Sequence, residues 1–296
     1  GTNFPRPINY TEIKGSAQVK SCILLAAMKT AGETKIKCIP SRDHTEKLFL
    51  YLNLPIKIKK KKKFETIVLN GKKNYKAFKY TIPGDISSSS FFIALTLLSK
   101  NSKILIKNVN VNNSRTGIID ILKIMNAKIY LKNKRTNNGE KIADIFVKSS
   151  NKLKSINCPA KMNSRSIDEF LIIFLICSVA NGVSKFRKIS ELRNKETDRL
   201  KFANNFLKKI GIKTKMTKSS FKIYGKPNLK LNKTYEIKNF DKDHRACMMS
   251  FIAALTLGGK WIIHDTDSIK TSFPNFIKIL KSLGAKINWW KIFLFQ

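Results

Sequence analysis

Four segments of this chain follow one template, and this internal repetition limits the possible folds more than any other feature of the sequence. Each copy begins with polar capping residues, enters an apolar helix, and continues through a short strand and a polar loop to a second helix. That helix ends in a turn containing Gly or Asn, and a strand containing Lys follows. The closing sequences lie at Leu52–Lys57, Met125–Ile129, Ile210–Lys213 and Leu283–Ile287. Because strands and helices alternate, the repeats predict an α/β fold of repeated units packed around shared helices.

The turn dipeptide Pro83-Gly84 is the expected boundary between two domains. Three copies follow it, so residues 84–296 are expected to form a second domain with three repeat units. The first copy stands alone before the boundary. Residues 1–83 are therefore expected to be the remaining part of a first domain that is incomplete at its N-terminus. Two polar stretches, Lys132–Glu140 and Asn228–Thr234, are predicted to be loops.

Ser166 and Glu169 have the S-x-x-E spacing of a capping box, which predicts a helix from Ile167 with Asp168 in its first turn. The next residues, Phe170–Ala180, are almost wholly apolar and predict a helix that is buried on all sides. A carboxylate at such a position can act as a general base, but Asp is also favoured in the first turn of any helix. Both interpretations of Asp168 stay open at this point.

A second helix is predicted over Lys195–Ile210, with Lys195 and Arg199 as i,i+4 neighbours and Glu196 beside them. Two cations next to a carboxylate can bind an anion and hold a proton donor, although a surface ion-pair network has the same pattern. Arg245, which follows Asp243-His244, repeats the arrangement at the start of the fourth copy.

In the first copy, Ser16, Ala17 and Gln18 open a helix that is expected to be buried. Their hydroxyl, amide and free backbone N–H groups can face an anion, or Ser16 is an ordinary N-cap. Arg42 lies in the loop after the first strand, where it can line a pocket or form a surface ion pair. The motifs interpreted as structural are a cap at Asp85 with Ser87–Ser90, a packing glycine in Thr116-Gly117, and packing side chains at Trp289 and Trp290.

The formal net charge of +39 over 296 residues is typical of proteins that bind nucleic acid. Most of the basic residues are lysines, however, and Lys57–Lys63 is nearly homopolymeric, which favours a solvated surface over a dedicated nucleic-acid site. The five cysteines form no C-x-x-C pair and are expected to be reduced, and the three histidines are too scattered for a zinc site. No metal or other cofactor is predicted. The longest apolar runs are too short to cross a bilayer, so no membrane partner is expected.

Eight motifs, in one order along nearly the whole chain, together resemble the 5-enolpyruvylshikimate-3-phosphate synthase family. They are Ser16–Ser21, Ser41–Lys47, Pro83–Ser88, Ser114–Gly117, Ile167–Phe170, Lys195–Arg199, Asp243–Arg245 and Thr271–Pro274. The resemblance implies an enolpyruvyltransferase-type fold, an inside-out α/β barrel of two domains made of βαβαββ units around buried helices, with substrates in the cleft between the domains. It also implies transfer of the enolpyruvyl group from phosphoenolpyruvate to the 5-hydroxyl of shikimate 3-phosphate, through a tetrahedral intermediate and with release of phosphate.

By position, the resemblance implies that Asp168 accepts the proton of the 5-hydroxyl and that Glu196 helps to move the proton at the enol carbon. Contacts with shikimate 3-phosphate are implied for Ser16, Ala17, Gln18, Arg42, Asp168 and Lys195. Contacts with phosphoenolpyruvate are implied for Gln18, Glu196, Arg199, Arg245 and Lys270. The expected protein is cytoplasmic, a monomer when complete, and without a specific nucleic-acid partner.

The family's first motifs, an N-terminal Lys with nearby Ser and Arg and a later Gly-rich segment followed by Arg, have no counterpart in this sequence. We therefore expect an N-terminally incomplete sequence with little or no activity by itself. The enolpyruvyltransferase that acts on UDP-N-acetylglucosamine shares the implied fold, but the Lys195–Arg199 and Asp243–Arg245 patterns favour the shikimate enzyme. A basic nucleic-acid-binding protein, supported by charge alone, is the other alternative.

Overall fold

The computed structural model describes residues 5–61, 63–72, 76–238, 240–287 and 294–295, and it divides into two compact units. Unit 1 contains Gly1–Pro83, Asn110–Arg115 and Asn133–Ala143. Unit 2 contains Gly84–Val109, Thr116–Lys132 and Asp144–Gln296. The first segment of unit 1 thus ends at the expected boundary, and two short segments from beyond that boundary join it. Trp289 and Trp290, for which packing was predicted, lie outside the described residues.

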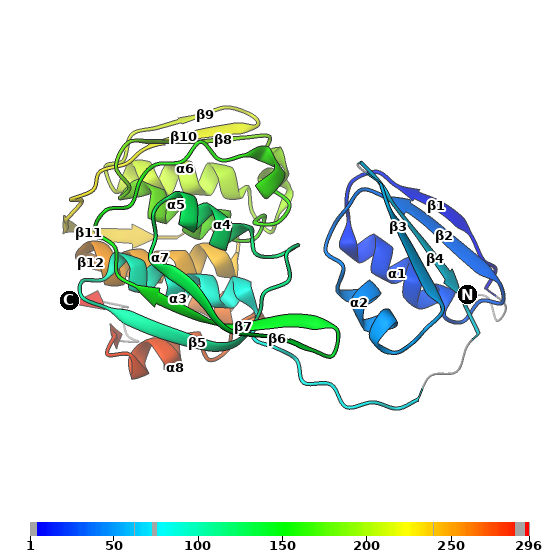
Figure 1. The fold of residues 1–296 in the computed structure, drawn as a ribbon. Helices are drawn as coiled ribbons and strands as arrows, with labels where there is room; N and C mark the ends of the chain where they lie inside the picture. The colour runs from blue at the N-terminus through cyan, green and yellow to red at the C-terminus, as the bar shows by residue number, and fades with distance from the viewer. Residues whose placement is uncertain (1–4, 62, 73–75, 239, 288–293, 296) are drawn as a thin grey trace. The chain divides into compact units, whose positions relative to one another are not determined.

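Unit 1 contains one βαβαββ repeat (Figure 1). Its elements are β1 (Asn9–Glu12), α1 (Ala17–Ala27), β2 (Glu33–Cys38), α2 (His44–Tyr51), β3 (Ile56–Lys60) and β4 (Glu65–Asn70). The strand order is β1-β2-β4-β3, with β1 parallel to β2 and the other two pairs antiparallel. Alternate residues of β2 and β4 are buried, as expected for a sheet with one covered face, and Ile36 and Ile67 share a core with Leu24 and Phe49.

Helix α1 is less buried than we predicted. Its buried residues are Lys20, Leu24 and Ala27, whereas Val19 and Leu25 are 38% and 56% exposed. The buried ammonium group of Lys20 is neutralised by Glu46 of α2, with 2.5 Å between Nζ and Oε1. A buried charge needs such a partner, and the pair joins the two helices of the unit.

A cluster of polar side chains holds the three segments of unit 1 together. Asn112 donates from Nδ2 to Oδ1 of Asp43 at 2.7 Å and to Oε2 of Glu140 at 3.3 Å. Nδ1 of His44 lies 2.5 Å from Oε1 of Glu140. Burial acts to raise the pKa of Asp43, but the hydrogen bond from Asn112 and the charge of Lys47 bring that pKa below its ordinary value. The segments at 110–115 and 133–143 are therefore joined to the first segment of unit 1 by these side chains.

Unit 2 contains three further copies of the repeat. The second copy comprises α3 (Ile86–Leu98), β5 (Lys103–Asn110), α4 (Gly117–Ile124), β6 (Ile129–Asn137) and β7 (Glu140–Lys148), although parts of β6 and β7 belong to unit 1. The third comprises the short 3-10 helix η1 (Ala160–Met162), α5 (Phe170–Ser178), β8 (Val183–Arg187), η2 (Ser190–Asn194), α6 (Arg199–Lys209), β9 (Thr214–Met216) and β10 (Ser220–Tyr224). The fourth comprises β11 (Leu231–Ile237), α7 (His244–Leu257), β12 (Gly258–Ile263), η3 (Thr266–Thr271), α8 (Phe276–Ser282), β13 (Lys286–Ile287) and β14 (Leu294–Phe295).

The strand pairing repeats along with the element order. The second and third copies have sheets in the order β5-β7-β6 and β8-β10-β9, which matches β2-β4-β3 of unit 1. The leading strand of the fourth copy, β11, is parallel to β12 as β1 is to β2. In the second and third copies the leading strand is reduced to parallel bridges, such as Gly84 with Val109 and Asn157 with Lys185. Within the described residues the predicted repeats are therefore confirmed as four versions of one α/β unit.

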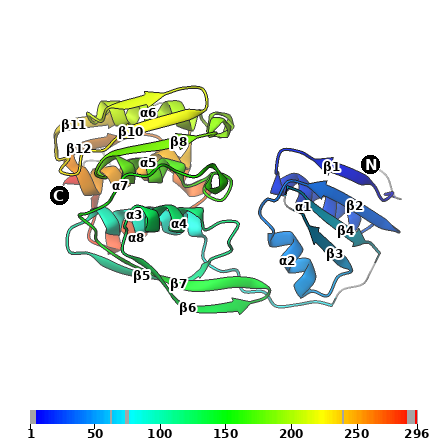
Figure 2. The ribbon, with the colours of Figure 1, turned by 45° about the horizontal axis from the view of Figure 1, so that its top comes forward.

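The first helices of these three copies, α3, α5 and α7, lie side by side and form the centre of unit 2 (Figures 1 and 2). All nine residues of α5 are buried, which confirms the prediction made from its apolar sequence. Hydroxyl side chains within this centre satisfy themselves locally: Ser90 donates to the carbonyl of Ser87, and Ser250 to that of Ala246. Asp85 caps α3 by accepting from the backbone N–H of Ser88, as predicted.

The second helix of every copy ends in the same hydrogen-bonded turn. Asn53, Asn126, Gly211 and Gly284 each have a positive φ. In each turn the next residue donates its N–H to a carbonyl five positions back, for example Ile212 to Leu207 at 2.9 Å and Ala285 to Leu280 at 3.0 Å. This is the Schellman arrangement, which satisfies the last carbonyls of a helix and favours Gly or Asn at the left-handed position.

Two loop predictions are wrong. The stretch Lys132–Glu140 lies mostly in strands β6 and β7, joined by the two-residue turn Asn138-Gly139, both with positive φ. An Asn-Gly pair is the preferred sequence for such a hairpin turn, and the polar residues around it hid the strands. The stretch Asn228–Thr234 runs into β11, which begins at Leu231. No helix within the described residues combines the length and the apolar composition needed to span a membrane.

Candidate active site

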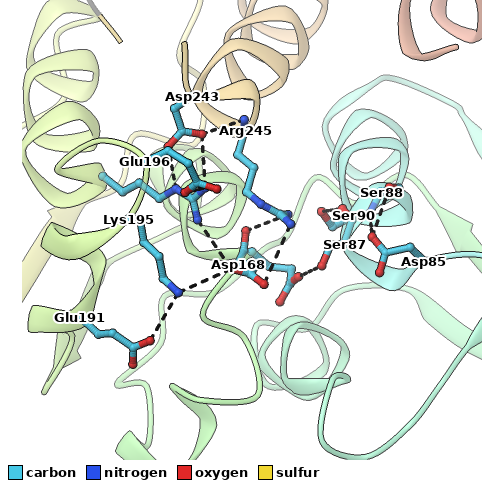
Figure 3. Close-up of polar contacts among 12 residues, drawn as sticks. Asp85, Ser87, Ser88, Ser90, Asp168, Glu191, Lys195, Glu196, Asp243 and Arg245 are labelled. Carbon is cyan, nitrogen blue, oxygen red and sulfur yellow. Dashed lines mark hydrogen bonds and ion pairs between the residues drawn. The ribbon is translucent and has the colours of Figure 1, made fainter. Parts of the chain in front are cut away.

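The carboxylate of Asp168 lies among three cationic side chains of unit 2 (Figure 3). Its Oδ1 atom is 3.9 Å from Nζ of Lys195 and 3.7 Å from Nη1 of Arg199. Its Oδ2 atom is 4.0 Å from Nη2 of Arg245, and Nη1 of Arg245 donates to the backbone carbonyl of Asp168 at 3.2 Å. Because the side chain of Asp168 is only 16% exposed, these charges interact across a space with little water to screen them.

Asp168 lies in a turn before α5, not inside the helix. The helix begins at Phe170, and Glu169 at its N-cap position makes no side-chain capping bond. The predicted capping box is wrong because Glu169 binds a residue of another helix and Oγ of Ser166 makes no hydrogen bond to a described residue. The carboxylate of Glu169 accepts a hydrogen bond from the hydroxyl of Ser87 on α3, and Ser166 is enclosed against Gly117 of α4.

The turn that carries Asp168 is held against the start of α4. The backbone N–H of Gly117 donates to the carbonyl of Arg165 at 3.2 Å. A Cβ atom on Gly117 would lie 2.1 Å from Oγ of Ser166 and 2.9 Å from the carbonyl carbon of Arg165. The predicted packing role of this glycine is therefore confirmed, since only a residue without a side chain lets α4 approach the turn this closely.

Lys195 precedes the helix in which we predicted it. The short helix η2 ends at Asn194, and α6 begins at Arg199 with Asp198 as its N-cap. Lys195 and Arg199 are therefore not i,i+4 neighbours on a helix, and they reach Asp168 from an irregular segment and a helix start, respectively. Lys195 also forms an ion pair with Glu191, at 3.4 Å. The helix starts at Arg199 instead because Asp198 caps it, its Oδ1 atom accepting the backbone N–H of Lys201 at 2.8 Å.

The guanidinium group of Arg199 is buried and is held by two carboxylates. Its Nε donates to Oδ2 of Asp243 at 2.8 Å and its Nη2 to Oδ1 of the same carboxylate at 3.3 Å. Nη2 also donates to Oε2 of Glu196 at 2.6 Å. The remaining nitrogen, Nη1, makes no hydrogen bond to a described residue and is the one nearest Asp168. The sequence alone does not pair Asp243 with Arg199, because these residues are far apart in the chain.

Asp243 also sets the position of Arg245. It is the N-cap of α7 and accepts hydrogen bonds from the backbone N–H groups of Arg245 at 2.9 Å and Ala246 at 3.3 Å. His244, which lies between Asp243 and Arg245 in the sequence, is half-buried next to the cation of Arg245. Burial, followed by the charge of Arg245, lowers the pKa of His244 below its ordinary value of 6.5. His244 therefore stays neutral down to a lower pH in the folded protein than in the unfolded chain.

Opposite charges are nearly balanced in this part of unit 2. Lys195, Arg199 and Arg245 supply three cations, while Asp168, Glu191, Glu196 and Asp243 supply four carboxylates. Asp243 is fully buried and committed to structural bonds, whereas the side chains of Asp168 and Glu196 are 16% and 48% exposed. The arrangement can bind an anionic molecule through its cations and exchange protons with it through two carboxylates.

Four of the residues for which substrate contacts were predicted belong to unit 1. Ser16 is the N-cap of α1 and accepts a hydrogen bond from the N–H of Val19 at 3.3 Å, which confirms its capping interpretation. Ala17 is half-buried and Gln18 exposed in the first turn of α1, and Arg42 is half-buried in the loop between β2 and α2. Their binding roles stay predictions.

Lys270 lies on η3 and pairs with Asp267, three residues earlier, at 2.6 Å. Both side chains are largely exposed, and the role of Lys270 also stays a prediction. In the part of the chain that the structure describes, no three His, Cys, Asp or Glu side chains gather as a metal site requires.

Comparison with known proteins agrees with the fold and the motif order. The sequence model of EPSP synthase (3-phosphoshikimate 1-carboxyvinyltransferase) matches residues 5–280. The chain belongs to this family. Two of its similar relatives are the 3-phosphoshikimate 1-carboxyvinyltransferases of Petrotoga mobilis, 39% identical over 287 residues, and of Ruthia magnifica, 38% identical over 286 residues. These alignments cover 96% and 95% of this chain, but only 65% and 63% of the relatives.

Solved structures of two enolpyruvyl transferases have the same fold as this chain. The EPSP synthase of Acinetobacter baumannii superposes with a TM-score of 0.85 at 34% identity, over 94% of this chain and 63% of that chain. The enolpyruvyl transferase NikO of Streptomyces tendae shares the fold with a TM-score of 0.70 at 16% identity, over 96% of this chain and 65% of that chain. The predicted enolpyruvyltransferase-type α/β fold is therefore confirmed, and this chain spans less than two thirds of the length of these relatives.

Proposed function

We propose that this chain supplies the catalytic groups for transfer of the enolpyruvyl group from phosphoenolpyruvate to the 5-hydroxyl of shikimate 3-phosphate, with release of phosphate. One observation carries the proposal: in a chain of the EPSP synthase family, the carboxylate of Asp168 lies within 4.0 Å of three cations. Both substrates are anionic, so a site for them needs cations, and the transfer itself needs groups that accept and donate protons.

In this reaction Asp168 takes the proton of the 5-hydroxyl as that oxygen forms a bond to the central carbon of phosphoenolpyruvate. Glu196, in its protonated form, donates a proton to the terminal carbon. The resulting tetrahedral intermediate then loses that proton back to Glu196, while the bond to phosphate breaks and the phosphate takes the proton from Asp168. Protons and electron pairs balance, and each carboxylate returns to its starting state.

The three cations have separate proposed tasks. Lys195 contacts shikimate 3-phosphate, and Arg199 and Arg245 contact phosphoenolpyruvate. Nη1 of Arg199 is suited to an anion because it is buried and has no hydrogen bond to a described residue. The other two nitrogens of Arg199 are bound to Asp243 and Glu196, so Nη1 offers an anion one point of contact. Further proposed contacts with the two substrates are those of Ser16, Ala17, Gln18, Arg42 and Lys270.

The test is calorimetric titration of the purified chain with shikimate 3-phosphate at physiological salt. Phosphate release in the presence of both substrates is measured alongside, and it is expected to stay far below that of a full-length relative because the family's first motifs have no counterpart in this sequence. The Acinetobacter baumannii enzyme serves as positive control, and UDP-N-acetylglucosamine as the rival acceptor. Saturable binding of shikimate 3-phosphate supports the proposal. Binding of UDP-N-acetylglucosamine instead would favour the sister transferase, and saturable binding of neither acceptor would favour the nucleic-acid alternative. Salt-sensitive retention on DNA does not discriminate, because any chain with a net charge of +39 is retained.

We further propose that the protein is monomeric and cytoplasmic, as suits an enzyme with soluble, charged substrates. Sedimentation equilibrium and cell fractionation test these two points separately. A concentration-dependent dimer would contradict the first, and recovery with membranes would contradict the second.

A further inference from the structure

The segment that carries Lys195 and Glu196 has no regular secondary structure. It connects η2, which ends at Asn194, with α6, which begins at Arg199. Both side chains nevertheless reach specific partners, since Nζ of Lys195 is 3.9 Å from Asp168 and Oε2 of Glu196 is 2.6 Å from Nη2 of Arg199. A loop that places two functional groups needs other residues to fix its course, because small displacements of such groups are costly.

Arg193 and Asp198 close this loop at its two ends. Nη1 of Arg193 is 2.6 Å from Oδ2 of Asp198, so one ion pair spans the four residues between them. The residues enclosed by this pair include both Lys195 and Glu196. The side chains of Arg193 and Asp198 are 25% and 29% exposed, so water screens their charges only in part.

The entry of the loop is also tied to the β9–β10 hairpin. Nε of Arg193 donates to the carbonyl of Lys218 at 3.0 Å, and its Nη2 donates to the carbonyl of Thr217 at 3.0 Å. All three guanidinium nitrogens therefore have an acceptor. Only the rigid fork of Arg offers donors in this geometry, and Lys in its place could satisfy one acceptor fully but not all three.

The exit of the loop is fixed to helix α6. Asp198 is the N-cap of that helix, and its Oδ1 atom accepts the backbone N–H of Lys201 at 2.8 Å, while Oδ2 binds Arg193. One carboxylate thus ties the loop to the helix that carries Arg199. The hairpin, the loop and the helix become one rigid arrangement around the two functional side chains.

We infer that Arg193 and Asp198 are positioning residues that direct Lys195 toward Asp168 and Glu196 toward Arg199. Neither of the two contacts a reacting group. The catalytic consequence rests on the proposed function, whereas the placement of Lys195 and Glu196 does not. Loss of the Arg193–Asp198 pair leaves the fold in place and releases the loop.

The placement is tested by competitive acetylation of lysines, read by mass spectrometry, in the wild-type chain and in Arg193→Ala, Arg193→Lys and Asp198→Asn. Lys195 is 22% exposed and contacts two carboxylates, so it reacts slowly while the loop is held. We expect several-fold faster labelling of Lys195 in Arg193→Ala, an intermediate rate in Arg193→Lys, and a small change in Asp198→Asn, which keeps the cap of α6. Arg187→Ala, an exposed arginine on β8, is the matched control and should leave the rate unchanged.

An unchanged labelling rate of Lys195 in folded Arg193→Ala would overturn the inference. So would equal acceleration in Arg187→Ala. If Arg193→Ala does not fold by circular dichroism, the labelling rates of Lys195 in Arg193→Lys and Asp198→Asn decide, because both variants keep a polar side chain in place. A faster rate in Arg193→Lys than in Asp198→Asn supports the inference, and wild-type rates in both would overturn it.

Phosphate release supplies the catalytic readout. We expect kcat to fall by about tenfold to a hundredfold in Arg193→Ala with little change in KM for phosphoenolpyruvate, as for a displaced catalytic group, and to recover in part in Arg193→Lys. A wild-type chain without binding or turnover counts against the proposed function alone, because lysine labelling still decides whether Arg193 and Asp198 hold the loop.

Discussion

Arg199 and Asp243 form a buried ion pair that joins the first turn of α6 to the first turn of α7. Two hydrogen bonds connect them, at 2.8 and 3.3 Å, and their side chains are 1% and 0% exposed. Each helix start also lies next to another functional group, since α7 presents Arg245 and the loop before α6 carries Glu196. A single carboxylate therefore sets the relative position of two cations.

Removing the carboxylate of Asp243 should be strongly destabilising. Asp243→Ala is expected to lower the free energy of unfolding by about 3–5 kcal/mol, because it removes the buried partner of Arg199 and leaves Nε of that guanidinium group without an acceptor. Asp243→Asn should recover part of that loss, since an amide oxygen can still cap α7. Urea denaturation followed by circular dichroism measures the effect, and Glu236→Gln in an exposed ion pair is the control. A loss no larger than in that control would show that the pair is not structural.

Asp168→Asn should reduce the rate of phosphate release by about 10²–10⁴-fold, because an amide cannot accept the proton of the 5-hydroxyl. Binding of shikimate 3-phosphate should change much less. Glu33→Gln, which alters an exposed carboxylate on β2, is the matched control and should retain the wild-type rate. Turnover of Asp168→Asn close to the wild-type value would exclude Asp168 as the base.

Gly117→Ala should destabilise the protein by about 1–3 kcal/mol, as overpacking does. The added methyl group would meet both Oγ of Ser166 and the backbone of Arg165. The double variant Gly117→Ala with Ser166→Ala should regain only part of the loss, because the backbone contact persists. Thermal unfolding provides the measurement. Gly84→Ala, whose added Cβ would lie 3.5 Å from its nearest neighbour, should unfold at nearly the wild-type temperature.

The closing turns predict an order of stability at Gly211. Its φ is +78°, and a Cβ atom added there would have no heavy atom of the described residues within 4 Å, so a substitution costs only backbone strain. Gly211→Ala should cost about 1–2 kcal/mol, whereas Gly211→Asn should cost less, because Asn already occupies this place at Asn53 and Asn126. The midpoints of urea unfolding should follow that order. Equal midpoints for the Ala and Asn variants would contradict it.

The lowered pKa of His244 predicts a pH dependence with a definite sign. As the pH falls through 6.5, the unfolded chain takes up a proton at this residue before the folded protein does. The free energy of unfolding should therefore decrease as the pH falls below 6.5, until the lowered pKa of the folded state is passed. His244→Gln should remove this part of the pH dependence, measured as urea midpoints between about pH 5 and 8. An unaltered pH profile in His244→Gln would assign the dependence to other groups.

The parts of the fold that sequence reasoning found correctly are those determined by neighbours in the chain. The closing turns followed from Gly or Asn at a helix end, and the burial of α5 followed from an unbroken apolar run. The error at Lys195 was also local: Asn194 and Asp198 are both good N-cap residues by type, and the structure uses Asp198. The hairpin at Asn138-Gly139 could have been found from that dipeptide alone.

The remaining errors concern residues whose partners are distant in the sequence. The pattern at Ser166 and Glu169 matched a capping box, but the carboxylate of Glu169 binds Ser87 on another helix. The pairing of Arg199 with Asp243 joins two repeats and leaves no periodic signal in either. Family resemblance was enough to identify the residues around Asp168. Their ion pairs and their burial could be found only from the three-dimensional structure.

The chain passes between the two units more than once, at 83–84, 109–110, 115–116, 132–133 and 143–144. A single proteolytic cut after Pro83 would consequently not free either unit. The longer product would keep Asn112 and Glu140, which bind Asp43 and His44 of the shorter one. Nicked protein should remain one particle under native conditions and separate only in denaturant, so the two units are inseparable by cleavage at the point where the sequence most resembles a linker.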